Sequence, residues 1–356
     1  MKILHTSDLH LASPLNAHLS GEGARMRKRE LSELPARLLE AARREGCSAM
    51  IIAGDLFDSE CVSRPALEAC LDAIRHAREI SVFYLAGNHE GEIIRESGLE
   101  LPKNLFIFGE DWTSFVAGDV VITGRSSLTA DAFDTLRLDP KMKNIVVLHG
   151  ELREHTEKDV IGRRDATGRG IDYLALGHYH SYDEHKLDGR TRAVYSGTPE
   201  GRGFDEVGDK GYVIIDTDER VIAPRFVPFA KRTIHWIKLD ITGVGTQGEL
   251  YELIDKRLAA VDSSSLVRLE LVGEYKEGLW KNAQSVERRF AGGFFYFEVR
   301  DSSRMALDLD KLRYDKTLKG EFIRLVMADD TIPPERKEKI ISCGLYSLLG
   351  EAAYEV

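Results

Sequence analysis

The chain contains 356 residues, of which 43% are hydrophobic and 30% are charged. These proportions are typical of an ordinary soluble globular protein and argue against a disordered chain, and the length favours two domains. The net charge of −10 argues against a protein that coats nucleic acid through bulk positive charge, although a local basic track beside a metal site is compatible with it.

Two further features bear on location. No apolar run approaches the length of a membrane span, and the N-terminal MKILHTSDLH lacks the apolar core and cleavage site of a signal peptide. We therefore expect a cytoplasmic protein with no membrane association. The cysteines Cys47, Cys61, Cys70 and Cys343 form no CxxC pair, which is typical of small buried hydrophobes in a reducing compartment.

The first part of the chain predicts strands that alternate with helices. Continuous apolar strands are expected at 2–8, 47–55 and 80–88, and amphipathic helices at 26–46 and 63–77. Pro35 is expected near a helix start or at a kink within the first helix. This order implies crossover connections and a parallel core, hence an α/β fold.

Beyond residue 104 the pattern changes to closely spaced strands. They are expected at 104–109, 115–118, 120–124, 144–150, 171–180, 193–197, 211–218 and 225–229, with a short helix near 131–137. The result is a large mixed sheet system with helices on its outer faces, over residues 1–230.

The last third predicts a smaller α/β domain at 231–330. Strands at 233–240, 265–273 and 294–300 alternate with helices at 248–260 and 279–292. The segment 331–356 predicts a C-terminal helix with Pro334 in its first turn.

The run IDYLALGHYH at 171–180 leads an apolar strand directly into a pair of histidines. In an extended strand, residues two apart point to the same side, so His178 and His180 are expected to project together, with Tyr179 turned away. Neutral histidine is a common metal ligand. For a single such pair, a solvated strand end with two unrelated histidines is the favoured interpretation.

The same kind of ending recurs after five predicted strands. In chain order, the polar residues at these ends are Asp8 and His10; Asp55 and Asp58; Asn88, His89 and Glu90; His149; and His178 and His180. Sites in open α/β sheets gather at the carboxyl ends of the strands, so these side chains are expected to form one site. Gly54, Gly87 and Gly177 precede ligand candidates, where a chain that turns sharply beside a metal favours a residue without Cβ.

The candidate donors are nitrogen and oxygen atoms only, and they outnumber the ligands of a single tetrahedral metal. We therefore expect two divalent metal ions with a bridging carboxylate, an arrangement that suits displacement at phosphorus. Mixed oxygen and nitrogen ligands favour manganese or iron over calcium, and zinc is an alternative.

Taken together, DLH, GDLFD, GNHE, LHGE and GHYH resemble the five motifs of the calcineurin-like metallophosphoesterases. The fit is closest to the SbcD-type DNA repair exonucleases, and the stretch YSGTPEGRGFDEVGDKGYVIID at 195–216 also resembles that family. The likeness covers residues 1 to about 230. It implies a four-layer β-sandwich flanked by helices for 1–230, and a capping domain for 231–330.

The resemblance also implies roles for individual residues. Asp8, His10 and His180 would hold one metal, Asn88, His149 and His178 would hold the other, and Asp55 would bridge them. His89 resembles the family's catalytic histidine, which stabilises the transition state or protonates the leaving oxygen.

Asp58 departs from several family members, which carry histidine at this place, whereas others have aspartate. Asp58 is interpreted either as a carboxylate that orients a ligand histidine or as a helix N-cap or solvated loop residue. The basic run RMRKR at 25–29 is interpreted as a solvated helix face in preference to a phosphate track.

The function that follows is a manganese-dependent DNA exonuclease and endonuclease in DNA repair, acting through a metal-activated water. The resemblance implies an SMC-like coiled-coil ATPase as partner and a homodimer. The alternatives are a general phosphatase or small-molecule phosphodiesterase of the same superfamily, and a non-catalytic scaffold subunit.

Overall fold

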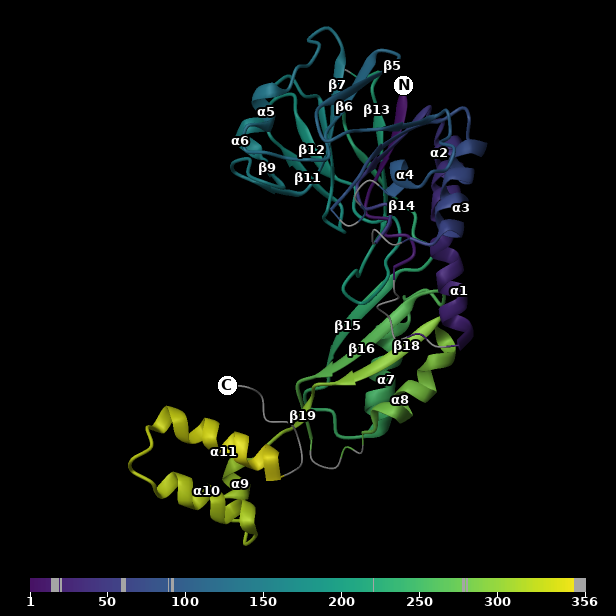
Figure 1. Ribbon diagram of the computed structural model, residues 1–356. Coiled ribbons are helices and arrows are strands. Elements are labelled where there is room, and N and C mark those ends of the chain that lie inside the picture. Colours follow the sequence, from purple (N-terminus) through teal and green to yellow (C-terminus); the bar gives the residue numbers. More distant parts are fainter. Residues whose placement is uncertain are drawn as a thin grey trace. The chain divides into compact units, whose positions relative to one another are not determined.

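The computed structural model describes residues 1–13, 19, 21–58, 62–88, 90, 93–219, 221–276, 279 and 281–348 (Figure 1). Backbone contacts divide the chain into two compact units, Met1–His235 and Trp236–Val356. Among the described residues, no helix is both long enough and apolar enough to cross a bilayer.

The first unit is built on two six-stranded sheets. The first sheet has the order β14-β13-β1-β2-β3-β4, and the second has the order β11-β12-β10-β7-β6-β5. The strands of the first are β1 (Lys2–Thr6), β2 (Ala49–Ala53), β3 (Ser81–Leu85), β4 (Leu105–Ile107), β13 (Gly211–Asp216) and β14 (Arg225–Pro228). Those of the second are β5 (Thr113–Ala117), β6 (Val120–Gly124), β7 (Lys143–His149), β10 (Tyr173–Gly177), β11 (Asp183–Lys186) and β12 (Arg192–Tyr195). A small separate ladder joins β8 (Glu151–Arg153) to β9 (Val160–Gly162).

Both sheets have a parallel centre, as the alternating pattern predicted. In the first sheet β1 to β4 pair in parallel, and in the second β6, β7, β10 and β12 do so. The two sheets pack face to face through apolar side chains such as Ile51, Phe83 and Ile145. Parallel strands bring their carboxyl ends to one edge, which is where the predicted site residues lie.

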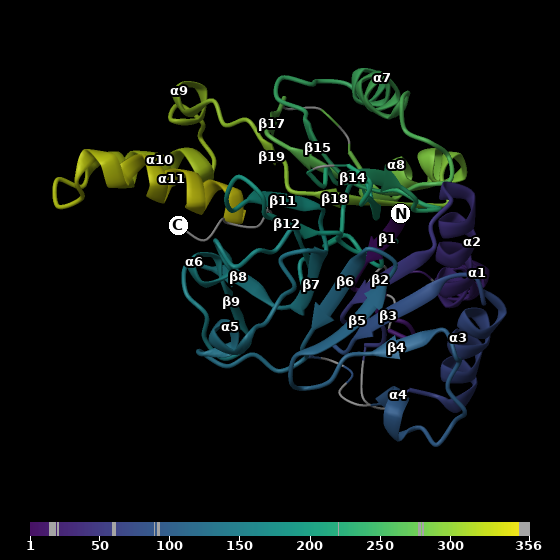
Figure 2. The same ribbon diagram turned by 90° about the horizontal axis from the view of Figure 1, so that it is seen from above.

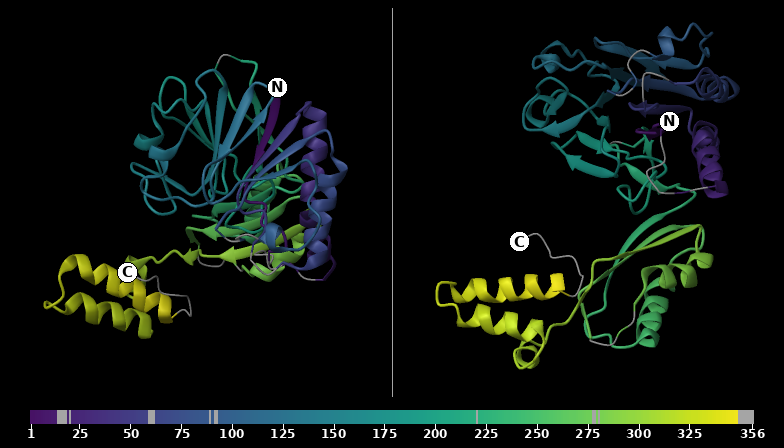
Figure 3. Two further views of the ribbon diagram at one scale, coloured as in Figure 1. Left: turned by 45° about the horizontal axis from the view of Figure 1, so that its top comes forward. Right: turned by 60° about the horizontal axis from the view of Figure 1, so that its bottom comes forward.

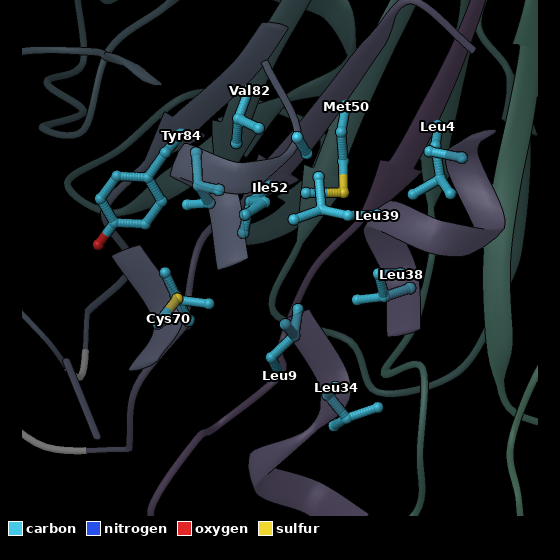
Figure 4. Packing of buried hydrophobic residues seen from close by; sticks show 14 of the residues in the cluster. Leu4, Leu9, Leu34, Leu38, Leu39, Met50, Ile52, Cys70, Val82 and Tyr84 are labelled. Atoms are coloured by element: carbon cyan, nitrogen blue, oxygen red, sulfur yellow. The ribbon is translucent and has the colours of Figure 1, made fainter. Parts of the chain in front are cut away.

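Helices cover the outer face of each sheet (Figure 2). The first sheet is covered by α1 (Gly21–Ser32), α2 (Leu34–Glu45) and α3 (Arg64–His76), and Figure 4 shows Leu38 and Leu39 of α2 near Met50 and Ile52 of β2. The short helices of this unit are α4 (Ile93–Glu96), α5 (Ala132–Thr135) and α6 (Arg163–Ala166). The α/β class, with sheets flanked by helices, is thus confirmed.

The single helix expected over 26–46 is wrong in one respect. The segment forms α1 and α2, and Pro35 lies in the first turn of α2, where its missing N–H is not needed. Gly46 ends α2 in the left-handed region, with φ 72°.

The second unit contains a three-stranded sheet of order β15-β16-β18 with helices packed on its apolar face (Figure 3). Its elements are β15 (Ile234–Asp240), α7 (Gln247–Leu258), β16 (Leu266–Val272), β17 (Glu274–Tyr275), α8 (Ala283–Phe290), the 3-10 turn Ala291–Gly293, β18 (Tyr296–Asp301), β19 (Arg304–Met305), α9 (Leu309–Leu312), α10 (Leu318–Ala328) and α11 (Pro334–Leu348). The predicted order of strands and helices is confirmed, and α11 begins at Pro334 as expected. We did not predict α10, which packs against α11 through Ile323, Val326, Ile341 and Leu345.

The basic run at 25–29 divides between surface and interior. Arg25, Lys28 and Arg29 are exposed, as the interpretation as a solvated face predicted. Arg27 is buried, and its guanidinium donates to Glu30 (3.2 Å), to Glu200 (2.9 Å) and to the carbonyl of Gly201 (2.5 Å). For Arg27 the surface interpretation is therefore wrong, because the side chain ties α1 to the segment after β12.

We predict that Arg27→Ala lowers the free energy of unfolding by about 2–3 kcal/mol, because it leaves buried carboxylates short of a partner. Arg29→Ala on the same helix is the matched control, since Arg29 pairs with Glu33 at the surface and its loss costs less than about 0.5 kcal/mol. Urea unfolding of both variants measures the difference. Equal, small losses would contradict the structural role of Arg27.

Candidate metal centre

The predicted site residues meet where strands of both sheets end. Asp8 and His10 follow β1, Asp55 follows β2 and Asn88 follows β3, all in the first sheet. From the second sheet, His149 is the last residue of β7, and His178 and His180 follow β10. His89 lies outside the described residues.

The backbone turns sharply at these strand ends. Asp8, His10, Asp55 and His178 all have positive φ values, of 53°, 45°, 50° and 108°. Residues other than glycine rarely adopt this region, and their clustering at one place is typical of functional sites.

The glycines beside the ligand candidates have the close neighbours that we expected. A Cβ on Gly54 would lie 2.1 Å from Nδ1 of His149, and a Cβ on Gly87 would lie 2.1 Å from Oδ1 of Asp55. A Cβ on Gly177 would lie 1.9 Å from the carbonyl oxygen of Ala53. Any larger residue would push the donors apart.

The expectation that His178 and His180 project together from an extended strand is wrong. β10 ends at Gly177, and the φ of 108° at His178 turns the chain. The His178 ring packs edge-on to His149, with centroids 5.6 Å apart, whereas Nε2 of His180 lies 3.2 Å from Nε2 of His10. Each histidine therefore faces a different half of the site.

One group of donors comprises Asp8, His10 and His180. Each offers a ligand atom, and these atoms lie within 4.8 Å of one another. Asp8 and His10 are buried and His180 is partly exposed, so the group opens to solvent on the side of His180.

A second group comprises Asp8, Asp55 and His149, whose donors also lie within 4.8 Å of one another. Asn88 adjoins it, with Oδ1 2.9 Å from Nε2 of His149. His178 has an exposed side chain, but its backbone N–H donates to both carboxylate oxygens of Asp8, at 3.0 and 3.1 Å.

Asp55 lies between the two halves. Its Oδ2 is 3.7 Å from Nε2 of His10 and 3.3 Å from Nε2 of His149. Asp55 therefore adjoins donors of both groups, as does Asp8, which belongs to each group.

Three histidines of the site donate from Nδ1 to acceptors outside the donor groups, which leaves Nε2 as the ring nitrogen that faces the site. Nδ1 of His10 donates to Asp58 (2.8 Å), that of His180 to Glu206 (2.7 Å) and that of His149 to the carbonyl of Ala53 (3.0 Å). Carboxylate and carbonyl oxygens only accept, so they fix this tautomer.

The resulting arrangement fits metal ions. Nε2 of His10 and Nε2 of His180 face each other, and Nε2 of His149 faces the oxygens of Asn88 and Asp55. Nitrogen donors combined with carboxylate donors suit divalent transition metals. The donor set therefore fits the predicted cofactor, without selecting among manganese, iron and zinc.

Burial and neighbouring charges shift the pKa values of the donors. Burial raises the pKa of Asp8 to about 6 and, together with Arg202, lowers that of His10 to about 4. Burial also opposes charge on His149, but its hydrogen bond to Asp55 prevails and raises the pKa of His149 to about 9. A positive charge in the centre would therefore stabilise the buried carboxylates in their ionised form.

Two carboxylates outside the donor groups support them. Glu90 is buried and accepts backbone N–H bonds from Leu56 (3.0 Å), Phe57 (2.6 Å) and Gly87 (3.1 Å), which ties the loop of Asp55 to the loop of Asn88. Asp58 contacts His10, in agreement with its interpretation as a carboxylate that orients a ligand histidine. The N-cap of α3 is Ser63, so Asp58 does not cap that helix.

Glu206 and Arg202 were missed as site residues. Both lie in the 195–216 stretch that carried the resemblance, but nothing in its spacing indicates that Arg202 reaches Asp58 after β2 or that Glu206 reaches His180 after β10. Their contacts depend on how the segment between β12 and β13 folds back over the site.

Comparison with known proteins places this geometry in a family. Residues 1–182 match the family of calcineurin-like phosphoesterases, and the chain belongs to it. The uncharacterized metallophosphoesterase YhaO of Bacillus subtilis (strain 168) is 28% identical over 303 residues, which are 78% of this chain and 73% of YhaO.

Solved structures similar to this chain include an archaeal phosphodiesterase and a dimetal phosphatase from Danio rerio. The phosphodiesterase is 14% identical, covers 64% of this chain and 100% of its own, and has a TM-score of 0.36. The phosphatase is 10% identical, covers 60% of this chain and 91% of its own, and has a TM-score of 0.39.

We predict that calorimetric titration with Mn²⁺ resolves binding of about two ions per chain. Asp55→Asn is expected to weaken both by roughly tenfold or more, because its carboxylate adjoins both donor groups. His180→Ala is expected to weaken only one.

The control for this titration is His76→Ala, which removes an exposed histidine on α3. If Asp55→Asn weakened only one ion, or neither, Asp55 would not bridge the two groups.

Proposed function

We propose that the chain is a metal-dependent phosphodiesterase that cleaves DNA, with a role in DNA repair. The observation that carries the proposal is the position of Asp55 Oδ2, within 3.7 Å of donor nitrogens from both groups. Donor groups that share a carboxylate place their ions close together, about 3.5–4 Å apart in known two-metal sites.

In this proposal Asp8, His10 and His180 hold one ion, and Asn88, His149 and His178 hold the other. Bound ions of this kind activate water and stabilise charge on phosphoryl oxygens. Asp55 would hold both ions at a fixed separation. Glu90 fixes the loop of Asp55 relative to the loop of Asn88, because it accepts hydrogen bonds from both. Manganese is the proposed ion, with iron and zinc as alternatives.

His89 is proposed to act on the leaving oxygen, from its place in the GNHE motif directly after Asn88. A histidine there supplies a proton or a positive charge to the oxygen that develops charge as the P–O bond breaks.

An aromatic side chain beside the donors supports a nucleic-acid substrate. Tyr179 is 46% exposed, and its ring is held edge-on by Tyr195, with centroids 4.8 Å apart. The ring also packs edge-on to His178, a proposed ligand, at 5.7 Å. An exposed aromatic next to a phosphate-cleaving centre can stack on the base next to the scissile bond.

The competing function is a phosphatase of the same family. The donor groups suit a phosphomonoester equally well, so the substrate test must include one. The proposals of an SMC-like coiled-coil ATPase partner and of a homodimer rest on the SbcD-type resemblance. Light scattering of the purified chain, alone and mixed with such an ATPase, tests both.

We predict Mn²⁺-dependent cleavage of end-labelled single- and double-stranded DNA, abolished by chelator and reduced about a hundredfold or more by His89→Ala. Product lengths distinguish exonuclease from endonuclease action. Rapid hydrolysis of a chromogenic phosphomonoester without DNA cleavage would instead establish the phosphatase. Undiminished cleavage by His89→Ala would contradict the role of His89.

We further predict that Tyr179→Ala lowers kcat/KM for single-stranded DNA by about tenfold, because base stacking is lost. Tyr179→Phe is the matched control and is expected to retain activity, since its ring remains. On a strand that is abasic near the scissile bond, Tyr179→Ala and the unaltered chain should be equal. An equal loss on both substrates would show that Tyr179 does not stack on a base.

A further inference from the structure

A single buried arginine contacts both carboxylates that orient histidines of one donor group. Nη1 of Arg202 donates to Asp58 Oδ1 (3.3 Å), and Nε and Nη2 donate to Glu206 Oε1 (3.1 and 2.6 Å). Asp58 accepts from His10, and Glu206 accepts from His180. The contacts therefore form a continuous chain from His10 through Asp58, Arg202 and Glu206 to His180.

This network of contacts joins parts of the first unit that, among the described residues, no strand pairing connects. Asp58 follows β2 of the first sheet, and His180 follows β10 of the second. Arg202 and Glu206 belong to the segment between β12 and β13, which passes from the second sheet to the first. Arg202 thus spans the edge at which the two sheets contribute their ligands.

The segment that carries Arg202 is itself held in place. The backbone N–H of Arg202 donates to Glu206 Oε2 (2.6 Å), and that of Glu206 donates to the carbonyl of Gly203 (3.0 Å). Lys210, further along the segment, donates from Nζ to the carbonyl of His180 (2.7 Å). His180 is therefore held by this one segment at both its backbone and its ring.

Electrostatics make the arginine necessary to this arrangement. Glu206 is 3% exposed and Arg202 is 8% exposed, so the carboxylate has little water to stabilise its charge. The carboxylate accepts from Nδ1 of His180 at 2.7 Å and from Nε and Nη2 of Arg202, so the guanidinium is a permanent positive charge in contact with it. Without the guanidinium, the carboxylate that fixes the His180 tautomer loses its main compensating charge.

We propose that Arg202 is a positioning residue that couples Asp58 and Glu206, and thereby sets the orientation of His10 and His180 toward one metal ion. Its planar fork reaches two carboxylates at once, which the ammonium group of lysine cannot do. The inference deepens the proposed function and rests on its assignment of His10 and His180 to one ion. It makes no use of the DNA substrate.

The test is calorimetric titration of the full chain with Mn²⁺, followed by electron paramagnetic resonance of the bound ions. Arg202→Met is expected to weaken one binding step by about 10–100-fold and to leave the other within about twofold, because only one donor group depends on the network. The resonance signal should change from a coupled pair of ions to a single isolated ion. Equal weakening of both steps, or of neither, would overturn the proposal.

Arg232→Met is the matched control for loss of a buried arginine. Arg232 is 9% exposed and forms a bidentate pair, at 2.8 and 2.7 Å, with Glu30, which is not a carboxylate that contacts His10 or His180. It is expected to lower the melting temperature while both Mn²⁺ binding steps stay unchanged. If it weakened Mn²⁺ binding as Arg202→Met does, the effect would be general destabilisation and the proposal would fail.

Milder substitutions distinguish the bridging role of Arg202 from the effect of its charge. They also keep the proposal testable where Arg202→Met does not fold. Arg202→Lys keeps the charge, so full recovery of Mn²⁺ affinity would overturn the bridging role, whereas recovery of only part of it is expected. Asp58→Asn and Glu206→Gln should each weaken the same binding step. Combined, they should weaken it by less than the product of their separate effects, because they act through one network; independent effects would contradict the coupling.

DNA cleavage measured in parallel separates the two claims. If the protein binds two Mn²⁺ ions and shows the predicted effect of Arg202→Met but cleaves no DNA, the positioning role stands and the proposed substrate is wrong. If the protein cleaves DNA but Arg202→Met binds Mn²⁺ as the unaltered chain does, the proposed substrate stands and the positioning role is wrong.

Discussion

Nitrogen and oxygen donor atoms of several side chains meet at the edge that the two sheets share, and the rest of the first unit depends on this constraint. Nε2 of His10 lies 3.2 Å from Nε2 of His180, and Nε2 of His149 lies 2.9 Å from Oδ1 of Asn88. Since Nδ1 of each histidine already donates to a carboxylate or carbonyl, Nε2 is the ring nitrogen that faces the other donors. A divalent cation between these atoms would be bound by all of them, so the fold is suited to hold positive charge.

The surrounding structure can be understood as support for that convergence. Parallel strands bring the donors to one edge, and left-handed residues turn the chain immediately after the strands. Glycines allow backbones to approach within the space that a Cβ would fill. Glu90 then joins two loops of the first sheet, while Arg202 joins the loop of Asp58 to that of His180. A centre built from two sheets needs such links, because no strand pairing joins the two sheets among the residues that the structure describes.

Much of this was predictable from sequence, because apolar strands followed at once by Asp, Asn or His give a strong local signal. The α/β class, the parallel centres and the clustering of residues from Asp8 to His180 follow from that pattern. What failed depended on backbone turns: the φ of 108° at His178 separates His178 and His180, although a strand would align them. The assignment of individual ligands and the role of His89 stay predictions.

Residues whose role depends on a partner far along the chain gave no comparable signal in the sequence. Arg27 belongs to a run that resembles a surface patch, yet it is buried against Glu200, which lies far along the chain. Arg202 reaches Asp58 after β2 and Glu206 reaches His180 after β10, and the fold of the segment between β12 and β13 creates these contacts. Periodicity reports the local environment of a residue, whereas such long-range pairs depend on how the two sheets meet.

Anomalous scattering from crystals grown with Mn²⁺ would test the central claim most directly. The account predicts a pair of anomalous peaks about 3.5–4 Å apart. One peak should lie among Asp8, His10 and His180 and the other beside His149 and Asn88, with Asp55 in contact with both. A single peak, or a pair that Asp55 does not bridge, would contradict the two-metal centre from which the proposed function was inferred.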